Sequence, residues 1–292
     1  MRAGDLGITL FVMLLWGLNF VVAKLGLQYV PPILFVALRF LVVAALLVPF
    51  VPVPRGRLKG IFALSVLLGL LHFTCMFSGM KMLDAGTSSV VVQLQLPFSV
   101  ILSALIFKDR FGWRSIVGMV LAFVGVILIA GQPRLSGNLF YVGLVVAAAL
   151  FFALANIQMK RLGDVNPNAI NAWMAVFATP MLICASAIFE SGQIAALESI
   201  SWPFLGALFY QSVVMVIVSY ALWYGLLRRH PVGQVVPFML LQPILGVLSG
   251  WALLGEPLTW EIILGGLLTL AGVGVIVVRR ARVTEPRVGS VN

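Results

Sequence analysis

The sequence has few charged residues: Asp, Glu, Lys and Arg make up 10% of its 292 residues, whereas about 25% is usual for a soluble domain. Hydrophobic residues make up 62% of the chain. Apolar runs of about 18 residues or more recur along its whole length, and each could cross the ~30 Å hydrocarbon core of a bilayer. This composition excludes an ordinary soluble domain and predicts an all-α integral membrane protein.

Reactive side chains are also scarce. The two cysteines, Cys75 and Cys184, fall inside apolar runs, which predicts buried apolar contacts and no disulfide framework or metal site. All nine carboxylates lie in loops, termini or helix ends, so coupling through a carboxylate within the membrane is not expected. The chain lacks H-E-x-x-H, G-x-S-x-G and phosphate-binding-loop motifs. We therefore expect neither an enzyme nor an ATP-driven pump, and no cofactor.

The apolar runs predict ten membrane spans joined by short connections. The first run is about 22 residues long and is followed by no small-residue cleavage site, so we expect it to be retained as a helix. The predicted spans are 6–28, 33–50, 60–80, 86–106, 113–130, 138–158, 168–188, 204–226, 232–254 and 260–278.

The basic residues are distributed unevenly over the connections. If the N-terminus is cytoplasmic, fifteen of the 19 Lys and Arg residues fall in cytoplasmic segments, and only Lys81 and Arg134 fall outside. Lys24 and Arg39 lie within spans. This bias predicts that both termini are cytoplasmic. It also accounts for the net charge of +10 without a nucleic-acid partner.

The second half of the chain repeats the first. Pro97 lies 146 positions before Pro243, and Trp113 lies 147 positions before Trp260. We expect two repeats, residues 1–133 and 134–292, with five spans each. Because five is odd, the repeats have opposite orientations. Such inverted repeats give one central site two exits, which is the basis of alternating access.

Uncharged polar groups within the spans are candidates for lining a central cavity. His72 is the one mid-span group with a pKa near neutrality, and it could contact substrate or simply bond a neighbouring helix. Amides offer both donors and acceptors, which suits a zwitterion or polar solute, but they also serve as packing contacts between helices. The candidate amides are Asn19, Gln93, Asn156, Gln211 and Gln242.

Aromatic and sulfur side chains could form the apolar walls of the cavity, although most aromatics in membrane proteins face lipid or the interface. The candidates are Trp16, Phe73, Met76, Tyr220 and Phe238. Trp16 lies nearly one helical turn from Asn19. Lys24 and Arg39 are interpreted as snorkelling to the interface, with a positively charged outer vestibule as the alternative.

Two further sets of repeated residues concern helix shape and packing. Pro97 and Pro243 are expected to kink their helices and act as hinges or mark a binding centre. Glycines seven positions apart predict close helix packing, either between the fifth and tenth spans or across a homodimer. These glycines are Gly118, Gly125, Gly265 and Gly272.

Two segments resemble the EamA domain of the drug/metabolite transporter superfamily: residues 16–20, Trp-Gly-Leu-Asn-Phe, and residues 255–260, Gly-Glu-Pro-Leu-Thr-Trp, before a glycine-rich last helix. The similarity covers the whole chain, although residues 108–111 depart from the pattern. The resemblance implies two inverted five-helix bundles around a central cavity, and metabolite export across the bacterial inner membrane. Within the superfamily the chain looks most like the YddG-type exporters of aromatic and other neutral amino acids.

The expected function is secondary transport of neutral or aromatic amino acids, with a small-molecule substrate and membrane lipid as partners. One alternative is an exporter of hydrophobic drugs or other small metabolites. An alternative from another class is a passive channel or a membrane scaffold that transports nothing.

Overall fold

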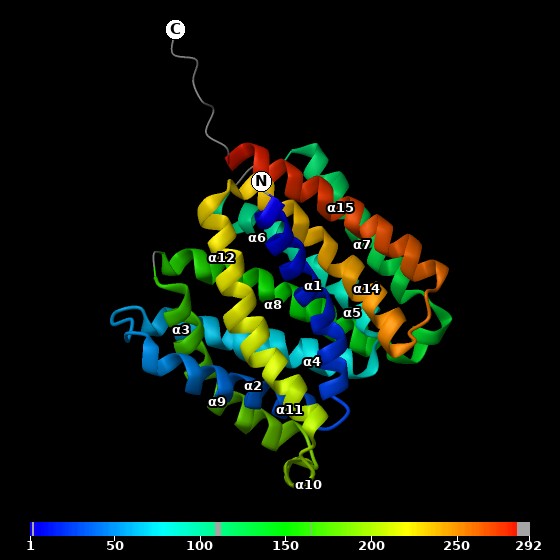
Figure 1. Ribbon diagram of the computed structural model, residues 1–292. Helices are drawn as coiled ribbons and strands as arrows, with labels where there is room; N and C mark the ends of the chain where they lie inside the picture. Colours follow the sequence, from blue (N-terminus) through cyan, green and yellow to red (C-terminus); the bar gives the residue numbers. More distant parts are fainter. Residues whose placement is uncertain (2, 109–111, 164, 285–292) are drawn as a thin grey trace.

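The computed structural model describes residues 1, 3–108, 112–163 and 165–284, with side chains at all of these except 232–233 and 278–284. Within these ranges the chain is helical and contains no β-strand (Figure 1). Ten helical segments are long and apolar enough to cross a membrane, which confirms the ten predicted spans. They are Ala3–Gly26, Pro32–Phe50, Leu58–Met82, Ala85–Phe107, Trp113–Ala130, Pro133–Leu162, Pro167–Phe189, Trp202–Arg229, Val236–Leu254 and Trp260–Val277.

Six of the spans are built on one long α-helix each. These helices are α1 (Ala3–Gly26), α2 (Pro32–Leu47), α7 (Trp113–Ala130), α8 (Leu139–Leu162), α9 (Pro167–Phe189) and α15 (Trp260–Thr284). A proline opens α2 and α9, where its missing N–H removes no helical hydrogen bond. Short helices also lie at span ends and in one connection: η1 (Val48–Phe50), η4 (Pro133–Asn138) and α10 (Gln193–Glu198).

The other four spans change helix type along their length, and they do so in repeat-related pairs. The third and eighth spans each contain a π-helical segment between two α-helices. In the third span, η2 (Ser65–His72) lies between α3 (Leu58–Leu64) and α4 (Phe73–Met82). In the eighth, η5 (Tyr210–Ser219) lies between α11 (Trp202–Phe209) and α12 (Tyr220–Arg229). The fourth span runs through α5 (Ala85–Val91), the 3-10 segment η3 (Val92–Leu94) and the proline helix α6 (Gln95–Phe107). The ninth span begins, just after the short helix α13 (Val232–Val235), with the 3-10 segment η6 (Val236–Leu240) and continues into the proline helix α14 (Leu241–Leu254). Helix irregularities of this kind often mark functional sites and hinges.

The two repeats are interleaved in space. The first helix of each repeat packs against the other repeat: α1 lies against α14 and η5, and α8 lies against α6 and η2. Equivalent helices also pair with each other, α2 with α9 and α7 with α15 (Figure 1). The third, fourth, eighth and ninth spans therefore share neighbours from both halves of the sequence.

Glycines allow α7 and α15 to approach closely. A Cβ atom built on Gly118 would lie 2.7 Å from the carbonyl oxygen of Gly272, and one on Gly125 would collide with the carbonyl oxygen of Gly265. Likewise, a Cβ atom on Gly265 would collide with the carbonyl oxygen of Gly125, and one on Gly272 with that of Gly118. The predicted glycine positions thus face one another across these two helices within one chain.

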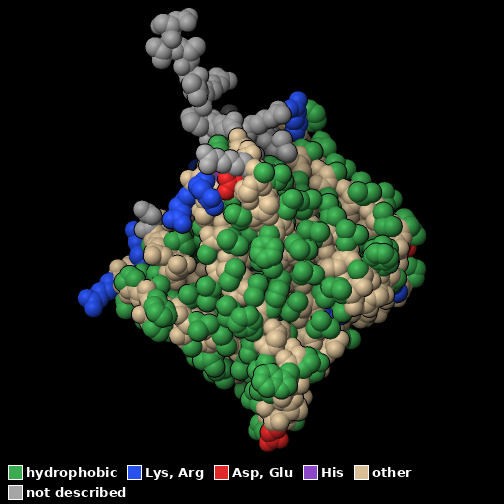
Figure 2. All heavy atoms as spheres, in the orientation of Figure 1, with side chains coloured by type: hydrophobic (Ala, Val, Ile, Leu, Met, Phe, Trp, Pro, Cys, Tyr) green, Lys and Arg blue, Asp and Glu red, His purple; other side chains and the backbone are tan. Residues whose placement is uncertain are grey.

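The surface follows the expected pattern of a membrane protein. Figure 2 shows a broad apolar face, with Lys and Arg side chains gathered along its upper-left margin. Large apolar side chains such as Phe140, Trp202 and Leu267 are exposed, as expected where lipid replaces water. The first turn of α1 and the last turn of α15 lie near each other at one edge of the bundle (Figure 1).

Candidate functional site

One cluster of aromatic and polar side chains forms where η2 and α4 meet α8. His72 is 6% exposed, and its Nδ1 donates a hydrogen bond to the carbonyl oxygen of Ala148 at 2.8 Å. The imidazole contacts the rings of Phe73 and Phe152, with centroids 4.8 and 5.3 Å away. We call His72, Phe73 and Phe152 the histidine cluster.

A second cluster forms where η5 and α12 meet α1. Trp16 Nε1 donates a hydrogen bond to Ser219 Oγ at 2.8 Å. Its indole contacts the rings of Tyr220 and Trp223, with centroids 6.1 and 5.1 Å away. We call Trp16, Ser219, Tyr220 and Trp223 the tryptophan cluster.

The two clusters are repeat counterparts. His72 and Phe73 precede Ser219 and Tyr220 by 147 positions, the offset of Trp113 and Trp260. In each cluster, the junction between a π segment and its following α-helix packs against the first helix of the other repeat. The same backbone arrangement thus presents imidazole and phenyl groups in one repeat, and indole, phenol and hydroxyl groups in the other.

Two predicted amides lie beside the tryptophan cluster. Gln211 Nε2 donates to the backbone carbonyl oxygen of Asn19 at 3.1 Å. The side-chain oxygens Asn19 Oδ1 and Gln211 Oε1 are buried without a hydrogen-bond partner. Buried polar atoms are rarely left unpaired, so two unpaired acceptors close together indicate a place for a donor.

The remaining predicted residues have varied surroundings. Phe238 packs against the tryptophan cluster, whereas Met76 is buried in the larger apolar core. Among the described residues, no hydrogen bond joins Gln93, Asn156 or Gln242 to either cluster. Asn156 is exposed on α8, whereas Gln93 is buried and Gln242 is half-buried.

Both repeated prolines are buried at the start of their α-helices. Ser89 Oγ donates to the carbonyl oxygen of Pro243 at 3.3 Å. Nearby, a Cβ atom on Gly246 would lie 2.7 Å from Ser89 Cβ and Oγ, so α5 and α14 touch at this level.

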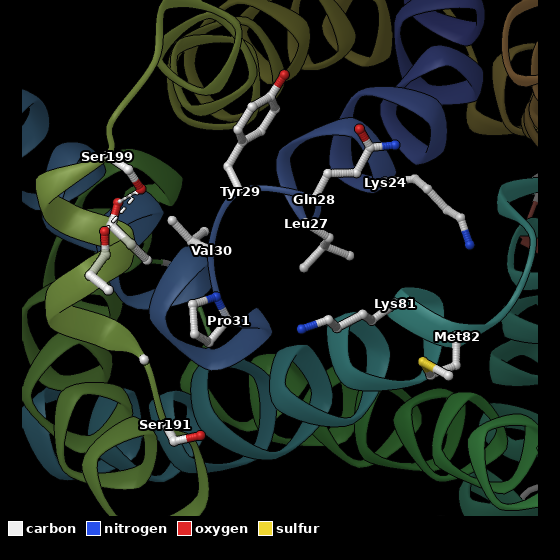
Figure 3. Close-up of a pocket in the computed structure, with 13 residues that line it drawn as sticks. Lys24, Leu27, Gln28, Tyr29, Val30, Pro31, Lys81, Met82, Ser191 and Ser199 are labelled. Carbon is white, nitrogen blue, oxygen red and sulfur yellow. Dashed lines mark hydrogen bonds between the residues drawn. The ribbon is translucent and has the colours of Figure 1, made fainter.

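A pocket of about 740 Å³ opens between the end of α1, the end of α4 and α10 (Figure 3). Lys24, Gln28, Lys81, Ser191 and Ser199 contribute its polar groups. None of the predicted cavity residues lines it. The pocket therefore forms a basic vestibule at this end of the bundle, separate from the two clusters.

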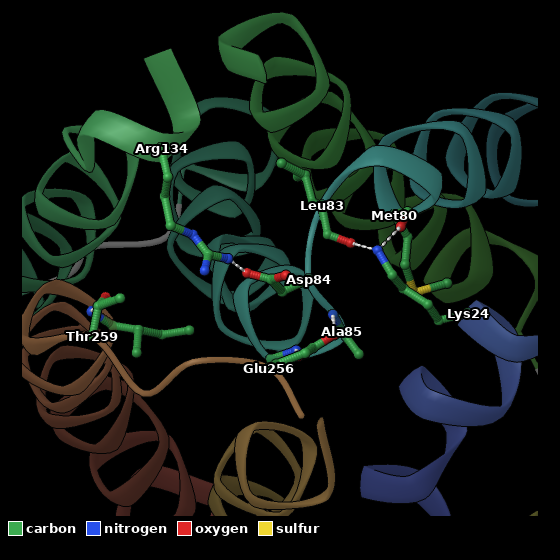
Figure 4. A network of polar contacts seen from close by, with 10 residues as sticks. Lys24, Met80, Leu83, Asp84, Ala85, Arg134, Glu256 and Thr259 are labelled. Carbon is green, nitrogen blue, oxygen red and sulfur yellow. Dashed lines mark hydrogen bonds and ion pairs between the residues drawn. The ribbon is translucent and has the colours of Figure 1, made fainter. Parts of the chain in front are cut away.

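Polar contacts tie helix ends together next to this vestibule. Lys24 Nζ donates to the carbonyl oxygens of Met80 and Leu83, and Arg134 pairs with Asp84 (Figure 4). Lys24 is thus anchored to protein carbonyls and does not snorkel freely.

At the opposite end of α1, Asp5 pairs with Arg229 at 2.8 Å and with His230 at 2.9 Å. Each end of α1 is therefore joined by a charged side chain to a different neighbouring span.

Sequence reasoning missed Phe152 and Ser219 of these clusters, and it misplaced Arg39. Arg39 was interpreted as snorkelling, which is wrong: it is 7% exposed inside the protein, where its guanidinium stacks on Phe73. Its position within an apolar run was the available signal, because ionisable residues inside a membrane span usually face the protein interior. Ser219 could have been found only through its repeat relation to His72.

The clusters offer donors, acceptors and aromatic faces, and the His72 imidazole and the Ser219 hydroxyl lie in different clusters, each engaged in hydrogen bonds. Among the described residues, no three His, Cys, Asp or Glu side chains lie close enough to bind a metal ion. This arrangement suits recognition of a small molecule without chemical change.

This chain is similar to known transporters over most of its length. The model of the EamA-like transporter family matches residues 3–131 and 139–278. A "Probable amino-acid metabolite efflux pump" of Salmonella typhimurium is 32% identical over 95% of this chain and 97% of its own length, and one of Escherichia coli is 31% identical over 91% and 92%. An "Uncharacterized transporter YoaV" of Bacillus subtilis is 28% identical over 90% of this chain and 92% of its own length.

A solved crystal structure has the same fold. Its TM-score is 0.64 at 19% sequence identity, and the match covers 98% of this chain and 100% of that chain. These similarities, together with ten spans in two repeats, identify a multi-pass membrane transporter and not an enzyme. The chain belongs to the EamA-like transporter family.

Proposed function

We propose that this protein exports neutral amino acids across the bacterial inner membrane by alternating access. The observation that carries the proposal is the pair of repeat-related clusters, which bring uncharged polar and aromatic groups together on irregular helices. The two bacterial relatives named as amino-acid metabolite efflux pumps support the same substrate class.

In this proposal the substrate binds between the repeats. Polar groups hold its charged ends: His72, Asn19 and Gln211, with Gln93, Asn156 and Gln242 contributing in other conformations. Apolar groups hold its side chain: Trp16, Phe73, Met76, Tyr220 and Phe238. The π and 3-10 segments lie in the four spans that carry or adjoin these groups, so a change of helix register there would move the walls of the site.

The proposed orientation of the protein in the membrane follows from the uneven distribution of its Lys and Arg residues. Fifteen Lys and Arg residues on one side predict that both termini face the cytoplasm. The basic vestibule around Lys24 and Lys81 then lies on the outer side, where it would be the exit path of the exporter.

The test is counterflow in proteoliposomes. Liposomes with purified protein and a high internal concentration of one neutral amino acid should take up labelled external amino acid transiently and saturably. Trp16→Phe, which removes the indole donor to Ser219, should weaken this uptake. Trp251→Phe, at a tryptophan 53% exposed on α14, is the matched control and should not.

The other outcomes distinguish the alternatives. Counterflow with apolar drugs but with no amino acid would favour a drug exporter. Unsaturable flux would indicate a channel, and no flux for any solute would indicate a scaffold.

A further inference from the structure

Arg39 is a buried cation without an anionic partner. It lies in the middle of α2, and only 7% of its surface is exposed. Its Nε is buried with no hydrogen-bond partner, and no ion pair involves its guanidinium among the described residues. Burying an uncompensated charge strongly destabilises a protein, so such a residue calls for a functional explanation.

The acids that the structure describes are engaged or placed elsewhere. Asp5 and Asp84 pair with other cations, and Glu190 and Glu256 accept backbone N–H bonds. Glu198 is exposed at the end of α10, and Glu261 lies in the first turn of α15. None of them is available to neutralise Arg39.

Arg39 connects the two clusters. Its guanidinium carbon lies 4.6 Å from the ring centroid of Phe73, in the histidine cluster. Its charge is close enough to affect the ionisation of His72 and of Tyr220 in the tryptophan cluster, so the guanidinium lies near both clusters. Stacking on an aromatic face fixes the planar guanidinium and leaves its edge for hydrogen bonding.

Unpaired acceptors lie on η5, which packs against α2, and on α1, which packs against η5. Ser212 Oγ donates to the Arg39 carbonyl oxygen at 3.4 Å, and the preceding residue, Gln211, bonds to Asn19. Asn19 Oδ1 and Gln211 Oε1 have no partner. An unpaired cation and two unpaired acceptors on adjoining helices match the carboxylate and the ammonium group of a zwitterion.

We propose that Arg39 binds the carboxylate of the transported substrate, and that Asn19 and Gln211 accept hydrogen bonds from its ammonium group. This inference rests on the proposed function and specifies it. The site takes substrates with a free carboxylate and rejects amines, amides and uncharged drugs. Arginine suits this role because its fork can bind both carboxylate oxygens.

The experiment compares an amino acid with its carboxamide, in which an NH2 group replaces one carboxylate oxygen and the negative charge is lost. Arg39→Met should weaken apparent affinity for the amino acid by about ten- to a hundredfold, as expected for losing charge-assisted hydrogen bonds. Affinity for the carboxamide should change less than about twofold, so the preference for the acid is lost. Arg39→Lys, which keeps the charge without the fork, should be intermediate. Arg228→Met, at an exposed arginine of α12, is the control and should keep the preference.

Thermal unfolding separates binding from a structural role. Without ligand, Arg39→Met should be at least as stable as the wild type, because it removes an unpaired buried charge. Amino acids should raise the melting temperature of the wild type only. A lower melting temperature of the ligand-free variant, or an unchanged preference for the acid, would overturn the inference.

A simple monocarboxylate distinguishes failure of this inference from failure of the proposed function. If amino acids are neither bound nor transported but monocarboxylates stabilise the wild type and not Arg39→Met, the proposed function fails and the role of Arg39 stands. If amino acids are transported and Arg39→Met keeps its preference for the acid, the proposed function stands and the role of Arg39 fails.

Discussion

The carboxylate of Glu256 caps a helix that begins 171 residues earlier at Ala85. Glu256 Oε1 lies 2.6 Å from the backbone nitrogen of Ala85, and Oε2 lies 2.9 Å from that of Gly86 (Figure 4). The first N–H groups of a helix have no partner within it, and a negative charge there interacts favourably with the helix dipole. Glu256 therefore ties the connection between the ninth and tenth spans to the start of the fourth.

Glu256→Ala should lower the free energy of unfolding by about 1–3 kcal/mol, because it leaves two buried donors unpaired. Gly250→Ala should act through the same contact, since a Cβ on Gly250 would collide with the Glu256 carboxylate. The double variant should therefore lose less than the sum of the single losses. Melting temperatures in detergent check this, with exposed Glu198→Ala as the control. Additive losses would show that the two positions act independently.

Glu256 illustrates which features can be predicted from the sequence and which depend on tertiary packing. Hydropathy located all ten spans, since span length and apolarity are local properties. The 147-residue repeat offset relates Glu256 to Asp109, but the partners of Glu256 are backbone N–H groups that only tertiary packing brings near. Its counterpart, Asp109, lies outside the described residues. Likewise, the sequence identified Trp16 and His72 as candidates, while the stacking of Arg39 on Phe73 depends on how α2 meets α4.

Helix packing at α7 and α15 gives a second prediction. Gly125→Ala should destabilise the protein by about 1–3 kcal/mol, because its Cβ would overlap the backbone of α15. Gly143→Ala is the matched control: Gly143 lies within α8 and has open space where a Cβ would be placed. Alanine there should be neutral or should stabilise the helix by roughly 0.5–1 kcal/mol. Equal melting temperatures for both variants would contradict this contact.

The membrane orientation gives a third prediction. Reporters fused after Asn292 and inserted in the 133–138 segment should lie on opposite sides, with the C-terminus cytoplasmic, because basic residues concentrate on that side. A reporter at Gly192 in the basic vestibule should behave like the one at 133–138. If the C-terminus lay outside the cell, the basic vestibule would face the cytoplasm and could not be the exit path.

The repeated prolines give a fourth prediction. Replacing Pro97 or Pro243 by alanine restores a backbone N–H and should straighten its helix. One regained hydrogen bond is worth about 0.5–1.5 kcal/mol, so transport should slow about two- to tenfold if the kinks must change shape during turnover. Pro180→Ala is the control, because Pro180 is exposed within α9, which carries none of the cluster residues. Insertion and substrate binding should be unchanged in all three variants. Wild-type turnover in both Pro97→Ala and Pro243→Ala would remove the hinge hypothesis.

The surroundings of His72 argue against an obligatory proton relay. Its Nδ1 donates to the Ala148 carbonyl oxygen, and its ring is flanked by Phe73 and Phe152, whose side chains have no exchangeable proton. The charge of Arg39 affects the ionisation of His72, but Arg39 gives up no proton at neutral pH. His72→Asn should therefore retain substantial flux with altered affinity, because the asparagine amide can replace the Nδ1 hydrogen bond. Substrate flux in proteoliposomes should also run down its own gradient when no pH gradient is imposed. Loss of all flux in His72→Asn, together with strict dependence of the wild type on a proton gradient, would instead make His72 the coupling site.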